Sequence, residues 1–142
     1  MKYRKYPLLF CAGGLGYMGI ELLWRGWTHG TMFFAGGTCF LLLGTVRRAP
    51  LSAINRAFLG AGAITAVELV AGLLVNRDFG VWDYRGMPLN FLGQICLPYS
   101  LLWVPVSWGA MALHGLLDKK MAQDTSYFCT CRFLFEQNTM DI

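Results

Sequence analysis

Charged residues are scarce in this sequence. Aspartate, glutamate, lysine and arginine together make up 14% of the 142 residues, whereas apolar residues make up 56%. Because an ordinary soluble domain carries about 25% charged residues, this shortage argues against one. The length leaves room for one compact unit and no second large domain. The formal net charge is +4, but no stripe of lysine and arginine follows a polar face, so we expect no nucleic-acid partner.

Motifs of catalysis and cofactor binding are missing too. The sequence has no GxxxxGK[ST] motif and no GxSxG nucleophile motif, and its GxGxxG match at Gly14–Gly19 lies inside an apolar run rather than between a strand and a helix. Its 5 cysteines show no disulfide-like spacing, and Cys129-x-Cys131 lacks the second pair that a zinc site needs. His29 and His114 are expected on opposite sides of a membrane, so they cannot share a metal. We therefore predict no enzyme activity, no cofactor and no metal site.

The apolar residues gather in long runs, typical of an all-α integral membrane protein with four transmembrane helices. A helix of about 20 residues spans the ~30 Å hydrocarbon layer. The first run contains Glu21 and has no cleavage site, so it reads as a retained helix rather than a signal peptide. The second is short for a span, and Pro98 and Pro105 should kink the fourth. The expected helices are Pro7–Trp27, Thr31–Val46, Ala57–Val75 and Asn90–Leu117.

Lysine and arginine lie at the ends of these runs and predict the orientation. Eight of the basic residues fall on one side of the membrane. The opposite side holds three, accompanied by Asp78 and Asp83. This asymmetry predicts a multi-pass protein of the cell membrane with both termini in the cytoplasm, with residues 1–118 as the transmembrane domain and 119–142 as a cytoplasmic tail. The inner set is Lys2, Arg4, Lys5, Arg47, Arg48, Arg56, Lys119 and Lys120, and the outer set is Arg25, Arg77 and Arg85.

The chain also shows an internal repeat. Gly13–Leu22 aligns without gaps on Gly60–Leu69, which matches Glu21 with Glu68. Thr31–Cys39 aligns more loosely on Pro88–Cys96. The repeat predicts two helical hairpins in parallel orientation, related by an axis along the membrane normal. Chance similarity among small and apolar residues is the alternative.

Small residues at four-residue spacing predict where helices approach closely. Ala12-xxx-Gly16 and Gly62-xxx-Ala66 would give flat helix faces. Such faces, in a small bundle surrounded by lipid, favour self-association into a homo-oligomer.

Candidate binding residues gather near the outer ends of the helices. Glu21, Arg25 and His29 share one helix face if that helix runs far enough, and Glu21 and Arg25 have the spacing of an intrahelical ion pair. Glu68 has no basic residue within helical reach, so its partner must be another helix, a bound cation or a proton. These acids and Arg25 either bind a solute or brace the bundle.

The connection before the fourth helix supplies the remaining candidates. Asp83 joins the predicted solute-binding set, although it could instead brace the turn. Asn90 is a further candidate, with the N-cap of the fourth helix as the simpler role. Trp82 and Tyr84 fit the aromatic belt of a membrane interface, and Gly93 has a structural role.

Two segments together resemble a known family. Glu21–Met32, ELLWRGWTHGTM, and Val81–Trp103, VWDYRGMPLNFLGQICLPYSLLW, are similar to a bacterial family of small multi-span proteins of ABC-transporter type, whose hallmark is a WDYS-like turn followed by Asn and Gly. Arg85 stands where that family usually has Ser. The resemblance covers about residues 7–118, and the end of the chain from Gln123 does not share it. It implies an inner-membrane protein related to transport.

Two functions follow from these observations. The first is a transport-related component that binds a small polar or cationic solute at the outer cluster, as an oligomer or with an ATPase or another membrane subunit. The second is a non-catalytic scaffold or regulatory subunit, in which the same residues are braces.

The orientation can be tested by cysteine labelling. In a variant without native cysteines, Thr28→Cys and Gly80→Cys should both react with an impermeant maleimide from the outer face of intact cells, because both positions follow outward-running helices. Reaction of either site only after the cytoplasmic face is opened would contradict this orientation.

Overall fold

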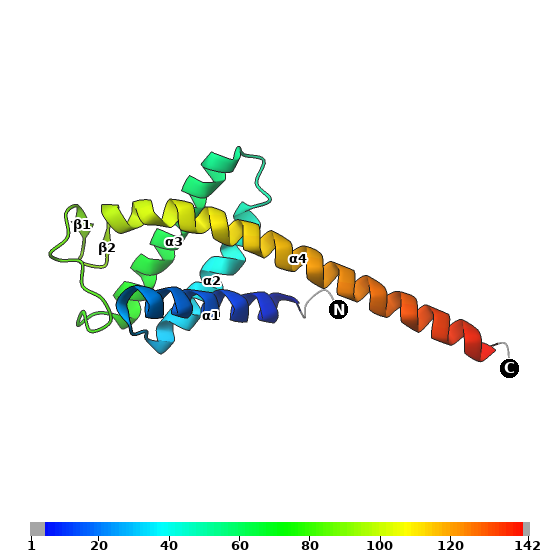
Figure 1. The fold of residues 1–142 in the computed structure, drawn as a ribbon. Coiled ribbons are helices and arrows are strands. Elements are labelled where there is room, and N and C mark those ends of the chain that lie inside the picture. The colour runs from blue at the N-terminus through cyan, green and yellow to red at the C-terminus, as the bar shows by residue number, and fades with distance from the viewer. Residues whose placement is uncertain (1–4, 141–142) are drawn as a thin grey trace.

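Four helices form most of the computed structural model, which describes residues 5–140 and the side chains of residues 5–123. They are α1 (Lys5–Arg25), α2 (Gly30–Val46), α3 (Ala53–Val75) and α4 (Leu97–Met140). Two short strands, β1 (Asn90–Phe91) and β2 (Ile95–Cys96), pair antiparallel in the long connection before α4 (Figure 1). The predictions for Lys2 and Arg4, and for the side chains of 124–142, lie outside the described part.

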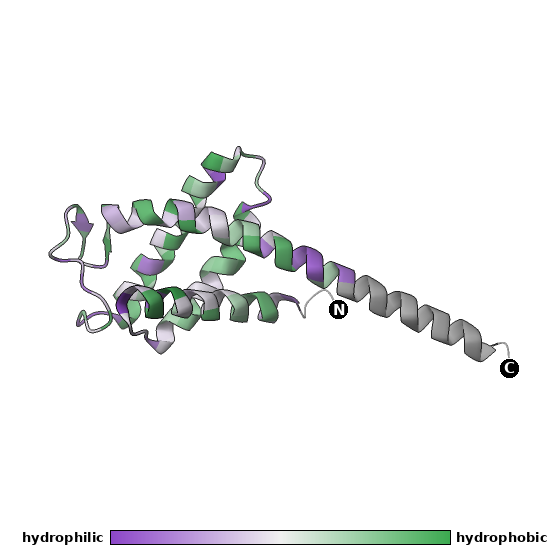
Figure 2. Ribbon diagram, viewed as in Figure 1, coloured by the Kyte–Doolittle hydropathy of each residue, from purple (hydrophilic) through white to green (hydrophobic). Residues whose placement is uncertain are grey.

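Three of the helices are long and apolar enough to cross a membrane: α1, α3 and the first part of α4, Leu97–Gln123. The shorter apolar α2 has 17 residues, which gives a length of about 26 Å at 1.5 Å per residue. The expected helical membrane protein is thus confirmed, with the short second run as predicted. Figure 2 shows apolar residues over all of these helices. Several of their large side chains are exposed, such as Leu23 at 91%, as lipid-facing residues should be.

The beginning of the fourth helix was predicted wrongly. α4 begins at Leu97, and Asn90 lies in a hairpin instead of capping the helix. The amide of Asn90 donates to the carbonyls of Arg85 and Met87, and its side-chain oxygen accepts from the N–H of Gly93. These local bonds compete with a helix, which is a common property of asparagine.

The two prolines of α4 therefore lie in different parts of the helix. Pro98 falls in the first turn, where a backbone N–H has no intrahelical partner. The prediction that Pro98 kinks the helix is therefore wrong. Pro105 remains inside the helix. α4 continues past residue 118 without a break, so no change of secondary structure marks the expected start of the tail.

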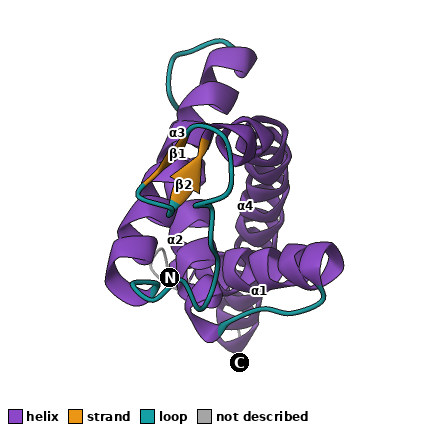
Figure 3. Cartoon of the chain, turned by 90° about the vertical axis from the view of Figure 1, so that its left-hand side faces the viewer, coloured by secondary structure: helices purple, strands orange, loops and turns teal. Residues whose placement is uncertain are grey.

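The closest packing joins α1 to α2 and α3 to α4, with α2 lying against α3. In Figure 3, which looks at the end of the molecule that carries the strands, the connection before α4 lies across this end of the bundle. Gly13 and Gly36 let the first pair approach, since a Cβ on Gly13 would lie 2.9 Å from the Gly36 carbonyl oxygen. The core between α2, α3 and α4 contains Cys39, Leu43, Ile64 and Met111.

The small-residue faces and the repeat fit the structure only in part. A Cβ added at Gly16 or Gly62 would meet no atom of the described residues within 4 Å, so within this part of the chain these two glycines do not make the close contacts that we predicted. The first repeated segments, 13–22 and 60–69, are both helical. The second alignment is wrong, because Thr31–Cys39 is helical whereas Pro88–Cys96 contains the hairpin.

The two predicted sets of basic residues lie at opposite ends of the bundle. At one end, which we name the basic end, Lys5 Nζ lies 2.8 Å and Arg47 Nη2 lies 3.4 Å from the carboxylate of Asp118. At the other, which we name the loop end, Arg25 contacts the 76–96 connection, which we name the cap loop. Which end faces the cytoplasm stays a prediction.

Candidate functional site

The C-terminal turn of α1 carries the predicted ion pair. Arg25 Nη2 donates to Glu21 Oε1, and the hydroxyl of Thr28 donates to Glu21 Oε2 at 2.6 Å. Arg25 Nη1 also donates to the carbonyl of Val81 at 2.9 Å, which ties α1 to the cap loop. The pairing of Glu21 with Arg25 is therefore confirmed, and both oxygens of this carboxylate have donors.

His29 does not share this helix face. α1 stops at Arg25, and Gly26 follows with a φ of 76°, a left-handed conformation that glycine adopts without strain. His29 instead caps α2, where its side chain accepts from the N–H of Thr31. The spacing argument failed here because the helix ended one turn early.

Glu68 receives its partners from two distant parts of the chain. The hydroxyl of Tyr84 donates to Oε1 at 2.9 Å, and the indole N–H of Trp103 donates to Oε2 at 3.1 Å. Tyr84 belongs to the cap loop and Trp103 to α4, so this carboxylate joins three elements. Burial, and after it the Glu68 charge, raises the pKa of the Tyr84 hydroxyl, so that hydroxyl stays a donor. Both donors are neutral.

A buried amide pair holds the cap loop in place. Asn76, which ends α3, is fully buried, and its amide donates to the carbonyl of Trp82 and to Gln94 Oε1. Its Oδ1 accepts from the N–H groups of Val81 and Trp82, and Gln94 Nε2 donates back to the Asn76 carbonyl. Satisfied networks of this kind specify one conformation. The indole N–H of Trp82 then donates to the carbonyl of Gln94, and the Tyr84 ring stacks on Tyr99 with centroids 5.0 Å apart.

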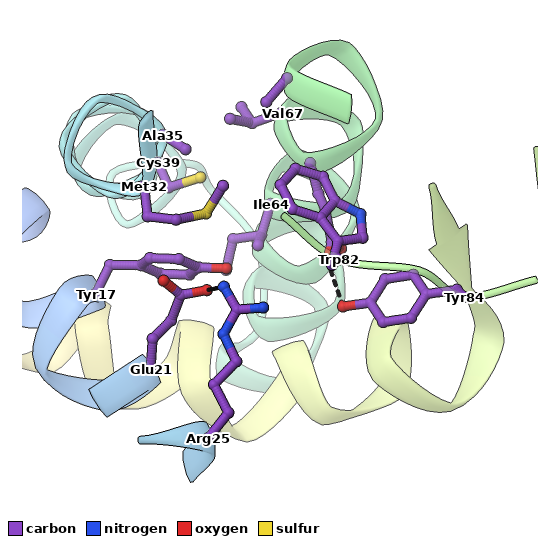
Figure 4. A pocket seen from close by; sticks show the side chains of 12 residues that line it. Tyr17, Glu21, Arg25, Met32, Ala35, Cys39, Ile64, Val67, Trp82 and Tyr84 are labelled. Atoms are coloured by element: carbon purple, nitrogen blue, oxygen red, sulfur yellow. Dashed lines mark hydrogen bonds and ion pairs between the residues drawn. The ribbon is translucent and has the colours of Figure 1, made fainter. Parts of the chain in front are cut away.

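A cavity of about 30 Å³ lies among these groups (Figure 4). Tyr17 and Glu21 reach it from α1, and Trp82 and Tyr84 from the cap loop. Glu68 lines it from α3. Two carboxylates and one guanidinium line it, so its lining carries a formal charge of −1 when all three are ionised. The full lining is Tyr17, Glu21, Arg25, Met32, Ala35, Cys39, Ile64, Val67, Glu68, Ala71, Trp82 and Tyr84.

A larger pocket of about 360 Å³ adjoins this cavity between α1 and α4. It shares five lining residues with the small cavity, Tyr17, Glu21, Arg25, Trp82 and Tyr84. Its other walls are mostly aromatic and apolar, and include Trp24, Trp103, Tyr99 and Leu102. Its volume lies within the ~300–1,000 Å³ typical of small-molecule sites.

Asp83, Asn90 and Gly93 lie elsewhere on the cap loop and do not line the small cavity. Asp83 is paired with Arg85, whose Nη2 lies 2.7 Å from Oδ2 on the surface. The side-chain hydrogen bonds from Arg85, followed by its backbone N–H, lower the pKa of Asp83 to about 2. The same pairing raises the pKa of Arg85. Gly93 is left-handed with a φ of 66°, and a Cβ there would lie 2.6 Å from Cγ of Arg85.

Three contributors to this site did not stand out in the sequence. Tyr17 and Trp103 lie within apolar helices, and they resemble ordinary packing residues until the fold places them beside Glu68. Gln94 is a polar side chain next to an apolar run. A lone polar residue in such surroundings was the one feature of the sequence that could have indicated its role.

Comparison with known proteins identifies the family. The model of the family described as Putative ABC-transporter type IV matches residues 17–134. The chain belongs to this family. No curated protein and no solved structure matches it.

The family match covers both segments on which the resemblance was based, and it contains every residue of the cavity lining. It starts later than the resemblance, at residue 17 rather than about residue 7. It also extends to residue 134, so the expectation that the family likeness ends before Gln123 is wrong.

The bond between Tyr84 and Glu68 can be tested by removing one hydroxyl. Tyr84→Phe should lower the free energy of unfolding by about 1.5–3 kcal/mol, the range for a hydrogen bond to a charged group. Tyr99→Phe is the matched control. It removes the hydroxyl from the ring that stacks on Tyr84, and this hydroxyl makes no described bond to Glu68. Equal unfolding free energies for the two variants in mixed micelles would contradict the assigned role of Tyr84.

Proposed function

We propose that this protein is a non-enzymatic, transport-related membrane component that binds a small monovalent cation beside Glu68. The observation that carries the proposal is the charge of the small cavity. Glu21 has a cationic partner in Arg25, whereas the described partners of Glu68 are two neutral donors. A carboxylate in an apolar membrane-spanning helix is costly without a compensating charge, and a bound cation supplies one.

The size of the cavity limits what this cation can be. A volume of about 30 Å³ holds two or three water-sized particles, since a single water needs roughly 10–15 Å³. An inorganic ion such as Na⁺ or K⁺ fits, and a bulky organic ammonium does not. The oxygens of Glu68 and the hydroxyls of Tyr17 and Tyr84 are hard ligands suited to such ions.

The larger pocket supports a transport role. It opens between α1 and α4 and shares its inner wall with the small cavity. A polar solute of the size of a small metabolite could therefore lie next to the bound ion. Glu21 and Arg25 line both spaces, so their charges are placed to respond to either occupant.

Energy for transport would come from another subunit. The sequence contains no phosphate-binding loop, whereas the description of the family names an ABC transporter, a class driven by ATP hydrolysis. We therefore infer that the protein acts with a separate ATPase subunit.

The proposal predicts a cation response that depends on Glu68. Adding Na⁺ or K⁺ at constant ionic strength, in exchange for N-methylglucamine, should raise the thermal unfolding temperature of the purified parent. A ligand at a hundredfold its dissociation constant adds about 2.7 kcal/mol of stability. Glu68→Gln keeps the shape and should fold without this response, because it removes the charge.

Two controls accompany Glu68→Gln. Asp78→Asn removes an exposed carboxylate outside the cavity lining, so it should keep the parent's response. Glu21→Gln should mainly weaken the contact with Arg25 and lower the unfolding temperature in every salt. A Glu68→Gln protein that gains as much stability from cations as its parent would overturn the proposal and favour the scaffold role.

A further inference from the structure

The basic end of the bundle carries more positive charge than the carboxylate of Asp118 neutralises. Lys5, Arg47 and Arg48 approach the carboxylate of Asp118 at 2.8, 3.4 and 3.7 Å. Three cations against one anion leave a surplus of two positive charges. Arg56 adds a fourth cationic side chain nearby, donating to the carbonyl of Arg47 at 2.7 Å.

The donors of this cluster are only partly used. Arg48 is 53% exposed and lies at the limit of an ion pair with Asp118. The Nε of Arg47 is buried and has no hydrogen-bond partner among the described residues. Because guanidinium groups bind phosphate through several parallel N–H bonds, this arrangement suits a phosphate-bearing anion.

An apolar groove lies between the two helices that carry Lys5 and Asp118, and its α4 lining ends at Leu113, five residues before Asp118. It has a volume of about 320 Å³ and is lined from α1 by Ala12 and Gly16 and from α4 by Gly109 and Leu113. The ion pair between Lys5 and Asp118 joins the same two helices beyond its end. Among the residues that the structure describes, Cβ atoms added at Gly16 or Gly109 would meet nothing within 4 Å, so the two glycines keep this groove open.

The length of the groove matches one lipid leaflet. Its α4 lining runs from Trp103 to Leu113, which is about 15 Å at 1.5 Å per residue. Half of a ~30 Å hydrocarbon layer is the same length. A molecule held here would place an apolar chain in the membrane interior and its head at the cationic cluster.

We propose that the basic end binds an anionic phospholipid, with its phosphate on Lys5, Arg47 and Arg48 and one acyl chain in the groove between α1 and α4. Charge complementarity selects the headgroup, and the groove selects a lipid over a free phosphate. A second copy of the chain could fill the groove but would leave the surplus cations unbalanced.

The test measures lipids retained by the full-length protein in native mass spectrometry. Phosphatidylglycerol is compared with phosphatidylcholine of the same acyl chains, and glycerol 3-phosphate serves as the soluble headgroup. The parent should retain phosphatidylglycerol in preference to phosphatidylcholine and should not retain glycerol 3-phosphate. Arg48→Gln should weaken phosphatidylglycerol binding about fivefold, and the Arg47→Gln, Arg48→Gln double variant more, at roughly 1 kcal/mol per charge. Arg77→Gln, at the loop end, is the control and should change nothing.

A second pair of variants tests the acyl chain. Gly109→Leu fills the groove and should reduce the retention of both lipids, whereas Gly62→Leu, an open helical glycine outside this groove, should not. Equal retention of the two lipids by the parent would overturn the proposal, as would tight binding of glycerol 3-phosphate. The proposal would also be overturned if the parent were a dimer that Gly109→Leu dissociates while the retention of lipid stays unchanged.

Discussion

The structure of the loop end depends on one carboxylate in an apolar helix. Glu68 lies among membrane-spanning residues of α3, where an unsatisfied acid would be costly. Its two oxygens accept hydrogen bonds from Tyr84 and Trp103, which are 16 and 35 residues away in the chain. To bring Tyr84 there, the chain must fold back over the end of α3 before α4 starts. The form of the cap loop follows from this requirement.

The cap loop stores strain and compensates for it with buried hydrogen bonds. Phe79, Leu89 and Leu92 adopt left-handed backbone conformations with φ between 51° and 57°, each at a cost of about 1–3 kcal/mol. The amides of Asn76 and Gln94 offset this cost, because they bond to one another and to the backbone of the loop. Strained residues held by their surroundings often accompany functional sites, and these lie in the segment that covers the charged cavity.

The sequence predicted much of what depends on local spacing, although not the place of His29, because α1 ends at Arg25. Apolar runs placed α2 and α3 with their ends at Val46 and Val75, and the four-residue spacing of Glu21 and Arg25 predicted their ion pair. Interactions between segments far apart in the chain could not be predicted from the sequence. The acid at Glu68 was recognised as unusual, but nothing local identified Tyr84 or Trp103 as its donors. The hairpin around Asn90 was missed because its side-chain bonds replace a helix that the apolar run favoured.

Locating a monovalent cation in the protein tests the central claim most directly. We expect a structure determined from protein equilibrated with Tl⁺, a heavy scatterer that substitutes for small monovalent ions, to show an anomalous peak in the small cavity. That peak should lie in contact with a carboxylate oxygen of Glu68 and disappear in Glu68→Gln. A cavity without Tl⁺ in a protein that is otherwise folded as described, or a peak that persists in the variant, would contradict the account of Glu68 as the cation-binding group.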